Sequence, residues 1–235
     1  YPCREANGIV FAYLGPGEPP AIAEFDCFVA PETHTFAFKG LIECNWLQAL
    51  EVGIDPVHAS FLHRFYEDKH TADGYGQQFR AAMTDAAMPV TRILREFDCP
   101  EIEIETTNYG IRIFALRSLD EETMHVRVTN LIFPNAIVIP LSNDMVLTQW
   151  HVPIDDVTCW WYAIFSSFRD VVDKDAMRHQ RLELYTLPDY APRRNRANDY
   201  GFDADEQRSE TYTGMGTDIN VHDTWAVESM GAVQD

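Results

Sequence analysis

From Glu101 onward the sequence alternates between apolar and other residues with a period of two, and this pattern limits the fold more than any other feature. Successive side chains of a β-strand point to opposite faces of a sheet, so the alternation predicts strands. Segments of this kind follow one another about every ten residues, separated by turns rich in Asn, Asp and Gly, which predicts an antiparallel meander. The expected strands are 101–105, 111–115, 124–129, 136–141, 145–152 and 158–165.

The strands of the meander differ in how apolar they are. The first three alternate cleanly, which predicts a sheet with one solvent-exposed face, whereas the later ones are apolar on both faces, which predicts a cover of helices. Residues 187–220 show little periodicity, and a structureless stretch of that length indicates a functional cover or a partner-binding segment. Further short strands are expected over 8–14 and 35–38, and helices over 45–66 with a break near Gly53–Pro56, over 170–186 and over 221–230. We therefore expect one α+β domain with helices on one side of an antiparallel sheet.

Composition excludes several classes of function. The 235 residues include 37 acidic and 18 basic side chains, a net charge of -19, and this argues against binding to nucleic acid. No apolar run approaches the length of about 18 residues that a membrane span needs. The five cysteines are odd in number and widely spaced without a Cys-x-x-Cys pair, which favours free thiols and a cytoplasmic location.

The run from Glu51 to His63, EVGIDPVHASFLH, contains two histidines and two carboxylates, which suit a first-row transition metal. On a regular helix His58 and His63 would point about 140° apart, so they can share a metal only if the helix is distorted or the metal sits across its side. Asp55 and His58 are three apart and share a face. Each residue also has a structural alternative. Asp55 before Pro56 suits a helix cap, Glu51 suits a solvated helix face, and His63 could lie at the surface.

A third ligand is expected on the last helix. Asp223 opens the segment 221–230 and precedes Glu228, although an acidic residue at that position is also favoured by the helix dipole. The adjacent His222 is expected to point elsewhere. Two histidines and one carboxylate form the facial triad of non-haem Fe(II) oxygenases, which leaves open positions for dioxygen.

The stretch NWLQALEVGIDPVHASFLH, Asn45–His63, resembles the mononuclear-iron motif of the α subunits of Rieske-type aromatic-ring oxygenases. That family has an Asn-Trp opening, an Asp three residues before the first His, the spacing His-x4-His, and a late Asp upstream of a Glu. The segment YPCREANGIVFAYLGPGEPP, at 1–20, resembles the part of the family that follows the Rieske domain. RVTNLIFPN at 127–135, DTWAVESMGAVQD at 223–235 and the glutamate at position 51 are similar to the phthalate 4,5-dioxygenase-like branch.

The resemblance implies a set of cofactors and partners. Fe(II) would be held by His58, His63 and Asp223, and O2 would react there with electrons passed from NADH through a ferredoxin-type reductase and a [2Fe-2S] cluster. The carboxylate of Asp55, with Glu51 nearby, would bridge His58 and the cluster of a neighbouring subunit in a homotrimer. The family fold is a helix-grip-like curled sheet that encloses a cavity.

The chain lacks the Cys-x-His and Cys-x-x-His pairs that hold a Rieske cluster, and it begins at Tyr1 without a methionine. We therefore expect residues 1–235 to be the mononuclear-iron catalytic domain, with the Rieske domain upstream and absent from this chain.

The substrate implied by the resemblance is an aromatic acid of the phthalate type, which would be dihydroxylated or O-demethylated. A carboxylate favours an arginine in the cavity, and each candidate arginine could instead form a surface ion pair. Strand residues could line the pocket or serve core packing and turns. The arginine candidates are Arg80, Arg95, Arg112 and Arg127, and the strand candidates are Asn130, Phe133 and Asn135.

Two other functions remain open from the sequence. A helix-grip sheet with a cavity could bind an apolar ligand without any metal, and His58 and His63 would then be structural. A zinc hydrolase could use the same histidines with an aspartate, although no glutamate base lies at helical spacing from them. Stoichiometric iron favours the oxygenase over both.

Overall fold

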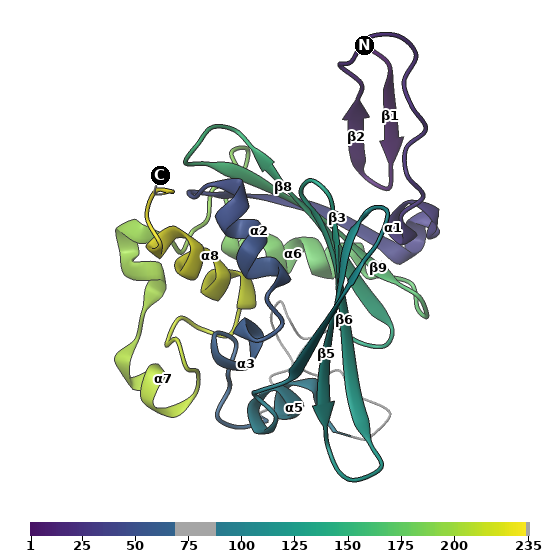
Figure 1. Cartoon of the computed structure of the whole chain (residues 1–235). Coiled ribbons are helices and arrows are strands. Elements are labelled where there is room, and N and C mark those ends of the chain that lie inside the picture. The colour runs from purple at the N-terminus through teal and green to yellow at the C-terminus, as the bar shows by residue number, and fades with distance from the viewer. Residues whose placement is uncertain (69–87, 234–235) are drawn as a thin grey trace.

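The computed structural model of the chain describes residues 1–68 and 88–233. Its centre is a seven-stranded antiparallel sheet in the order β3-β9-β8-β7-β6-β5-β4 (Figure 1). The strands from β4 to β9 are neighbours in chain order, so the expected meander is confirmed, and β3 completes the sheet beside β9. The strands are β3 (Thr35–Ile42), β4 (Glu101–Thr106), β5 (Gly110–Ser118), β6 (Met124–Ile132), β7 (Ala136–Pro140), β8 (Met145–Pro153) and β9 (Cys159–Ser167).

The register of β5 and β6 decides which side chains face the helices. Ile113 pairs with Thr129 and Ala115 with Arg127, and both apolar partners are buried. Because side chains alternate along a strand, Arg127 and Thr129 share this inner face, and Asn130 points to the opposite one.

The edge strand β4 departs from the expectation of one buried face. All six of its residues are exposed, including Ile102 and Ile104. As the last strand of the sheet, β4 has a neighbouring strand on one side only. The clean alternation of its sequence therefore does not produce a buried face.

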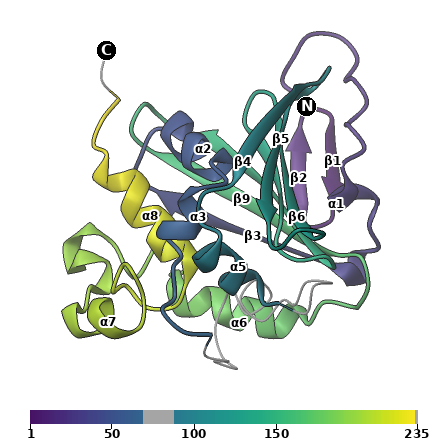
Figure 2. The same ribbon diagram turned by 60° about the horizontal axis from the view of Figure 1, so that its bottom comes forward.

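Helices gather along one side of the sheet (Figures 1 and 2). Helix α2 packs on β6, β7 and β8, α6 packs on β3, and α8 packs on α2. The expected α+β arrangement is thus confirmed, and the break between α2 and α3 falls where Gly53–Pro56 indicated. The helices on this side are α2 (Trp46–Ile54), α3 (His58–Phe61), α5 (Val90–Glu96), α6 (Lys174–Leu184) and α8 (Ile219–Ser229).

The main apolar core lies between the sheet and helix α6. Phe36 and Phe38 of β3 pack there with Phe165 of β9 and Met177 of α6. Burial of each such side chain contributes about 1.5–3 kcal/mol. Leu141 and Leu147 belong to this core and also line the cavity described below, so the core fixes one wall of the site.

The N-terminal hairpin stands out from the body in Figure 1. Strands β1 (Cys3–Ala6) and β2 (Ile9–Ala12) are joined by Asn7 and Gly8, both with positive φ, as in a two-residue type I′ turn. Only β2 was expected, although Asn-Gly is a strong hairpin signal. Phe11 anchors the hairpin by packing against Phe28 of α1 (Asp26–Val29) and Trp150 of β8.

The segment 187–220 is not structureless. It contains the 3-10 turns of η2 (Arg196–Gly201) and the short helix α7 (Ala204–Ser209), capped by the side chains of Asn195 and Asp203. Another short 3-10 turn, η1 (Glu32–His34), precedes β3. These elements are too short to leave a periodic pattern in the sequence.

Within residues 1–68 and 88–233, no helix combines the length and apolar character that a membrane crossing requires. All five cysteines lie in these ranges, and each is a free thiol. Cys27, Cys44 and Cys159 are buried, whereas Cys3 and Cys99 are exposed.

Candidate metal centre

The turn between α2 and α3 sets the position of the first histidine. Asn45 caps α2 by accepting a hydrogen bond from the backbone N–H of Leu47 at 2.9 Å. After the helix ends, the carboxylate of Asp55 accepts hydrogen bonds from the backbone N–H groups of Val57 at 2.8 Å and His58 at 3.1 Å. The Asp55 side chain therefore holds the turn that leads into α3. It is not the helix cap weighed from the sequence, because Val57 occupies the N-cap position of α3.

Helix α3 is a single turn that ends before His63. Because the two histidines do not belong to one regular helix, their rings can face the same space. The ring centroids of His58 and His63 lie 5.1 Å apart. The distortion that a shared metal requires is therefore present.

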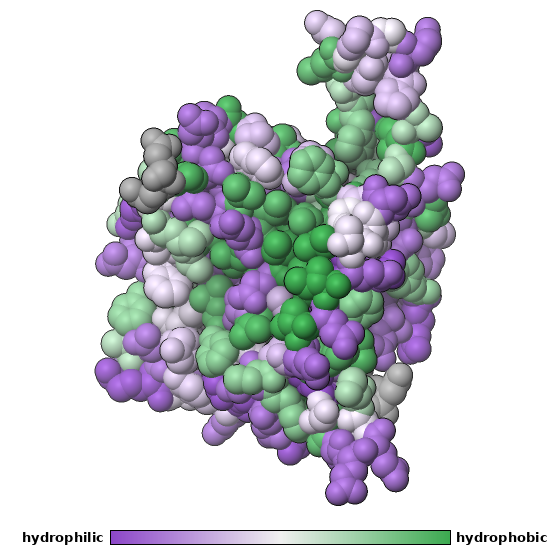
Figure 3. Space-filling model, in the orientation of Figure 1, coloured by the Kyte–Doolittle hydropathy of each residue, from purple (hydrophilic) through white to green (hydrophobic). Residues whose placement is uncertain are grey.

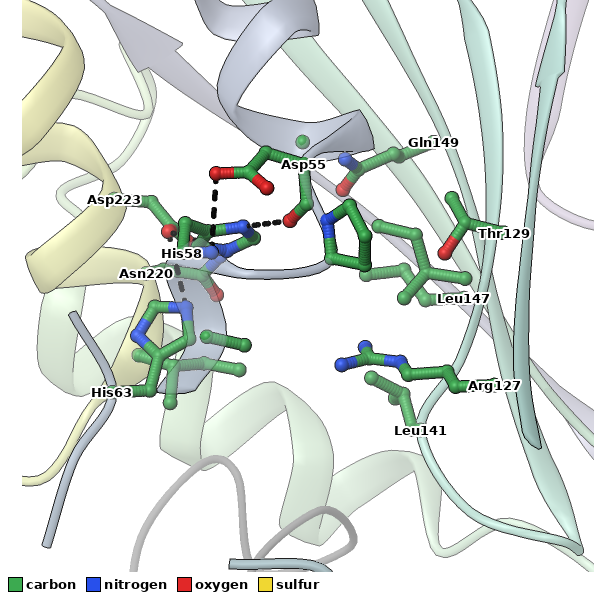
Figure 4. A pocket seen from close by; sticks show the side chains of 15 residues that line it. Asp55, His58, His63, Arg127, Thr129, Leu141, Leu147, Gln149, Asn220 and Asp223 are labelled. Carbon is green, nitrogen blue, oxygen red and sulfur yellow. Dashed lines mark hydrogen bonds and ion pairs between the residues drawn. The ribbon is translucent and has the colours of Figure 1, made fainter. Parts of the chain in front are cut away.

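Asp223 reaches the same space from α8. This helix begins at Ile219 behind the cap residue Asp218, earlier than expected, so Asp223 lies in the second turn and is not an N-terminal acid favoured by the dipole. Its Oδ1 atom is 3.2 Å from Nε2 of His63 and 3.7 Å from Nε2 of His58. One ligand atom from each of the three residues lies within 4.8 Å of the others (Figure 4).

The donor set fits a divalent metal. The Asp223 side chain is 31% exposed, yet its Oδ1 atom is buried and accepts no hydrogen bond in the part of the chain that the structure describes. Leaving a buried acceptor unsatisfied costs about 1–3 kcal/mol, which a bound cation would offset. Ligand atoms about 2 Å from one ion, at right angles to each other, lie about 3 Å apart. The 3.2 Å between Oδ1 of Asp223 and Nε2 of His63 is close to this value.

The electrostatics of the cluster also suit a metal ligand set. Burial lowers the pKa of His58, the charge of His63 lowers it further, and Asp223 opposes both. His58 is therefore neutral near pH 7 and offers a lone pair. Burial alone would raise the pKa of Asp223, but His63, His58 and His222 together outweigh it and hold that pKa below its usual value. The site thus presents an ionised carboxylate.

The ring of His58 is oriented by the main chain. Its Nδ1 atom is in close hydrogen-bond contact with the carbonyl oxygen of Asp55, which turns Nε2 toward Asp223. The expected link from the Asp55 carboxylate to this ring is replaced by a link from the Asp55 carbonyl, because the carboxylate accepts hydrogen bonds from the backbone N–H groups of Val57 and His58.

A cavity of about 60 Å³ adjoins the cluster. Leu141 and Leu147 form an apolar wall, and Arg127 projects from β6 toward the histidines (Figure 4). Burial, followed by the charge of Arg117, lowers the pKa of Arg127 to about 10, so this guanidinium stays charged at neutral pH. The remaining polar lining residues are Asp55, Thr129, Gln149 and Asn220.

Several residues proposed from the sequence lie outside this cavity. Arg112 and Asn130 are cross-strand partners on the opposite face of the sheet, where Arg112 pairs with Glu105 at 3.0 Å. Phe133 is 77% exposed beyond the end of β6. The strand alternation that directs Arg127 inward directs Arg112 and Asn130 outward. Neither of them lines the cavity, and neither does Phe133.

The other candidates are placed as follows. Glu51 is exposed on α2 and does not line the cavity. Arg95 forms an ion pair with Asp68 at 2.9 Å, the surface alternative foreseen for it. Asn135 donates a hydrogen bond to the carbonyl of His151, and Arg80 lies outside the described residues.

Sequence reasoning missed Thr129, Gln149, Asn220 and His222. Thr129 could have been found, since it lies two residues from Arg127 on the same strand face. The other three carry no local signal. Asn220 and His222 reach the site through the packing of α8 on α2, and Gln149 through the place of β8 in the sheet.

A larger hollow of about 630 Å³ lies between the N-terminal hairpin and the sheet, lined by Phe11, Lys39, Trp150 and Tyr190 among others. It contains none of the three clustered ligand residues. The space-filling view shows apolar side chains over the middle of the molecular face and the protruding hairpin above it (Figure 3). The candidate metal ligands converge at the smaller cavity instead.

Comparison with known proteins identifies relatives of the chain. A family model described as "LigXa C-terminal domain like" matches residues 12–235. The chain is 29% identical over 228 residues to the oxygenase subunit of phthalate 4,5-dioxygenase from Pseudomonas putida, covering 92% of this chain and 49% of that protein. It is 31% identical over 189 residues to the oxygenase subunit of tert-butanol monooxygenase / tert-amyl alcohol desaturase from Aquincola tertiaricarbonis, covering 74% and 37%.

Among solved structures, the terminal oxygenase of carbazole 1,9a-dioxygenase from Nocardioides aromaticivorans IC177 matches with a TM-score of 0.51 at 16% identity. The match covers 98% of this chain and 59% of that one, and at this identity it shows a shared fold. The chain spans about half the length of the phthalate 4,5-dioxygenase subunit that it matches.

Proposed function

The chain belongs to the LigXa C-terminal-domain-like family, within the catalytic domains of Rieske-type oxygenase α subunits, and we propose that it binds Fe(II) and oxygenates an aromatic acid. The observation that carries the proposal is the convergence of His58, His63 and Asp223 beside a cavity lined by a half-buried arginine. Two histidines and one carboxylate are the ligand set of non-haem Fe(II) oxygenases.

The three ligand residues would hold the ion from one side. The chemistry that the ion supplies when bound is reductive activation of O2 at the positions that the protein leaves open. His58 and His63 each present Nε2, and Asp223 presents Oδ1. Leu141 and Leu147 form an apolar wall that limits the access of water from that side.

Arg127 is the residue that would select the substrate. Its guanidinium faces the ligand cluster across the cavity (Figure 4), and a charged arginine binds a carboxylate through two parallel hydrogen bonds. An aromatic acid held there would present its ring to the open positions of the metal. Two relatives have names that fit this class: a phthalate 4,5-dioxygenase oxygenase subunit, and a 5,5'-dehydrodivanillate O-demethylase oxygenase subunit from Sphingobium that matches 27% of this chain. The relative named a tert-butanol monooxygenase does not fit it.

The cavity must widen to admit such a substrate. Benzene fits an engineered apolar cavity of about 150 Å³, whereas the cavity beside Arg127 measures about 60 Å³. Binding of an aromatic acid is therefore expected to displace side chains of the apolar wall.

Electrons would come from outside this chain. We assign their source to a Rieske [2Fe-2S] domain, supplied by NADH through a ferredoxin-type reductase, in an assembly of three subunits. Asp55 is suited to the bridge, because it is exposed and its carbonyl contacts the ring of His58. Glu51 precedes Asp55 by four residues and is exposed on α2.

The experiment uses nitric oxide as a paramagnetic probe of the metal. The chain is loaded with Fe(II) without oxygen, treated with nitric oxide, and its electron paramagnetic resonance spectrum is recorded with and without phthalate or a methoxybenzoate. We expect a high-spin iron–nitrosyl signal whose shape changes when the acid is added, because the substrate lies beside the metal.

A folded chain that takes up no iron, yet binds a neutral apolar ligand, would contradict the proposal. A signal that no aromatic acid perturbs would contradict the substrate class alone. Turnover of the complete oxygenase with its reductase then separates dihydroxylation, which yields a diol, from demethylation, which releases formaldehyde.

A further inference from the structure

His222 is buried behind the metal-ligand cluster. It is fully inaccessible to solvent and immediately precedes Asp223 on α8. The sequence indicated that it points away from the site, but its ring lies beside that of His63, with ring centroids 5.6 Å apart and an angle of 27° between the planes. The two Nδ1 atoms lie 3.4 Å apart, within hydrogen-bond contact. His63 is therefore in contact with Asp223 through one nitrogen and with His222 through the other.

The far nitrogen of His222 determines how the pair shares protons. Its Nε2 atom lies 2.9 Å from the carbonyl oxygen of Gly216. A carbonyl oxygen only accepts hydrogen bonds, so Nε2 of His222 must carry the hydrogen. In a neutral ring the Nδ1 atom then has a lone pair, and it can accept a hydrogen bond from His63.

The same logic then applies to His63. If its Nδ1–H donates to His222, its own Nε2 atom has the lone pair. That atom is the one that lies 3.2 Å from Oδ1 of Asp223. The two contacts, from Gly216 to His222 and from His222 to His63, thus favour the tautomer of His63 that carries its hydrogen on Nδ1 and can bind a metal through Nε2.

The Gly216 carbonyl is held firmly in place. Gly216 has a φ of +81°, a conformation that glycine adopts without steric cost. Its N–H donates to Oε1 of Glu206 at 2.8 Å, and Arg194 donates to the neighbouring carbonyl of Met215 at 2.6 Å. The segment 187–220, which has little periodicity in the sequence, therefore contributes a fixed acceptor to the site.

We propose that His222 is a positioning residue that, through the Gly216 carbonyl, fixes the tautomer and orientation of His63 for metal binding. The inference rests on the proposed function, since it concerns how a ligand is presented to iron. A main-chain carbonyl group then orients the ring of each of the two histidine ligands. His58 contacts a main-chain carbonyl directly, and His63 does so through an intervening imidazole.

Two variants separate this role from simple packing. His222→Leu places an apolar side chain of similar bulk at this position and removes the acceptor for His63. His222→Asn places its carbonyl oxygen close to where Nδ1 lies, so it retains the acceptor while losing the contact to Gly216. A packing role alone predicts that the smaller, polar asparagine harms the site at least as much as leucine does.

The test measures the affinity of the chain for Zn(II), used alone as a redox-inert probe, by competition with a chelating dye. We expect His222→Leu to lose about 10–100-fold in affinity, the effect typical of removing a partner of a metal-bound histidine. His222→Asn should retain most of the wild-type affinity. A loss in His222→Asn at least as large as that in His222→Leu, or no loss in His222→Leu, would overturn the inference and leave the proposed function standing. A folded wild-type chain without affinity for Zn(II) and Fe(II) would overturn both.

A second measurement does not depend on how the variants fold. Two-bond 1H–15N correlation spectra of the wild-type chain report which nitrogen of each histidine carries the hydrogen. The inference requires the hydrogen of His222 on Nε2 and, with Zn(II) bound, the hydrogen of His63 on Nδ1. A His222 ring with its hydrogen on Nδ1, or on both nitrogens, would contradict it.

Discussion

Oδ1 of Asp223 lies 3.2 Å from Nε2 of His63, although one residue belongs to the last helix and the other to the first third of the chain. The contact depends on how α8 is fixed. Glu228, further along α8, accepts hydrogen bonds from the backbone N–H of Glu43 at 2.9 Å and from the Tyr200 hydroxyl at 2.6 Å. The Glu228 side chain therefore ties the Asp223 helix to the end of β3 and to η2.

Replacement of Glu228 by leucine should weaken both the fold and the metal site. The change leaves the Glu43 N–H and the Tyr200 hydroxyl without their acceptor in a buried region, which costs about 1–3 kcal/mol for each group. Urea unfolding measures the loss of stability, and Zn(II) competition measures the loss of affinity. Glu183→Leu, on the exposed face of α6, is the control and should change neither. A Glu228→Leu chain of wild-type stability would contradict this view of α8.

Arg127→Met should reduce the binding of aromatic acids selectively. A hydrogen bond to a charged group contributes about 1.5–3 kcal/mol, which corresponds to a loss of about 10–100-fold in affinity. Titration calorimetry with phthalate gives the loss, and the matching neutral diester should be unaffected. Arg112→Met changes an arginine outside the cavity and should bind phthalate as the wild type does. Equal effects of the two substitutions would show that Arg127 contributes only general charge.

His151 should make the chain sensitive to mild acid. Burial lowers the pKa of His151 to about 4, with Asp223 acting in the opposite direction, whereas an unfolded histidine has a pKa of about 6.5. As the pH falls below about 6.5 the unfolded chain takes up a proton that the folded chain refuses, so stability is lost between about pH 6.5 and 4.

The size of this effect follows from the two pKa values. By pH 5 the contribution of His151 reaches about 2 kcal/mol. Unfolding free energies at pH 7.5 and 5 should therefore differ less in His151→Gln than in the wild type. His179→Gln, at an exposed position, should leave the pH dependence unchanged. An unaltered pH dependence in His151→Gln would refute the assignment.

Gly53→Ala should destabilise the chain, although alanine usually favours a helix by about 1 kcal/mol over glycine. A Cβ atom at Gly53 would lie 2.7 Å from Cδ1 of Ile137 and 3.2 Å from Nε2 of Gln149. Since Ile137 is fully buried, the overpacking should cost about 1–3 kcal/mol in thermal or urea unfolding. Glu51→Ala, on the exposed side of the same helix, should stay within about 0.5 kcal/mol of the wild type. If Gly53→Ala stabilises the chain, the neighbouring side chains of Ile137 and Gln149 can move aside, and the expected overpacking is wrong.

The meander and the long helices could be predicted because their signals are local. Alternation over 124–129 and the apolar pattern over 170–186 depend on residues adjacent in the sequence. The order in 187–220 could not be predicted, because it rests on contacts such as that of Arg194 with the Met215 carbonyl. Helix α5 is too short for a reliable pattern.

The part of the candidate site that lies in one local motif was also predictable, and the rest was not. The histidines and Asp55 lie in one motif, whereas the choice of Arg127 among the arginines needs the pairing of β5 with β6. Alternation alone shows that Thr129 and Asn130 cannot both line one cavity, but not which of them does. The side chain that His222 meets depends on how α8 docks, which no local pattern encodes.

The most direct test of the central claim is the iron content of the chain after anaerobic equilibrium dialysis against Fe(II). The wild type should bind one Fe(II) per chain, and His58→Gln and Asp223→Asn should each retain only a small fraction of it while remaining folded. His179→Gln and Asp205→Asn, at exposed positions, should bind as the wild type does. Stoichiometric iron in Asp223→Asn, or none in the folded wild type, would contradict the assignment of this cluster as the metal site.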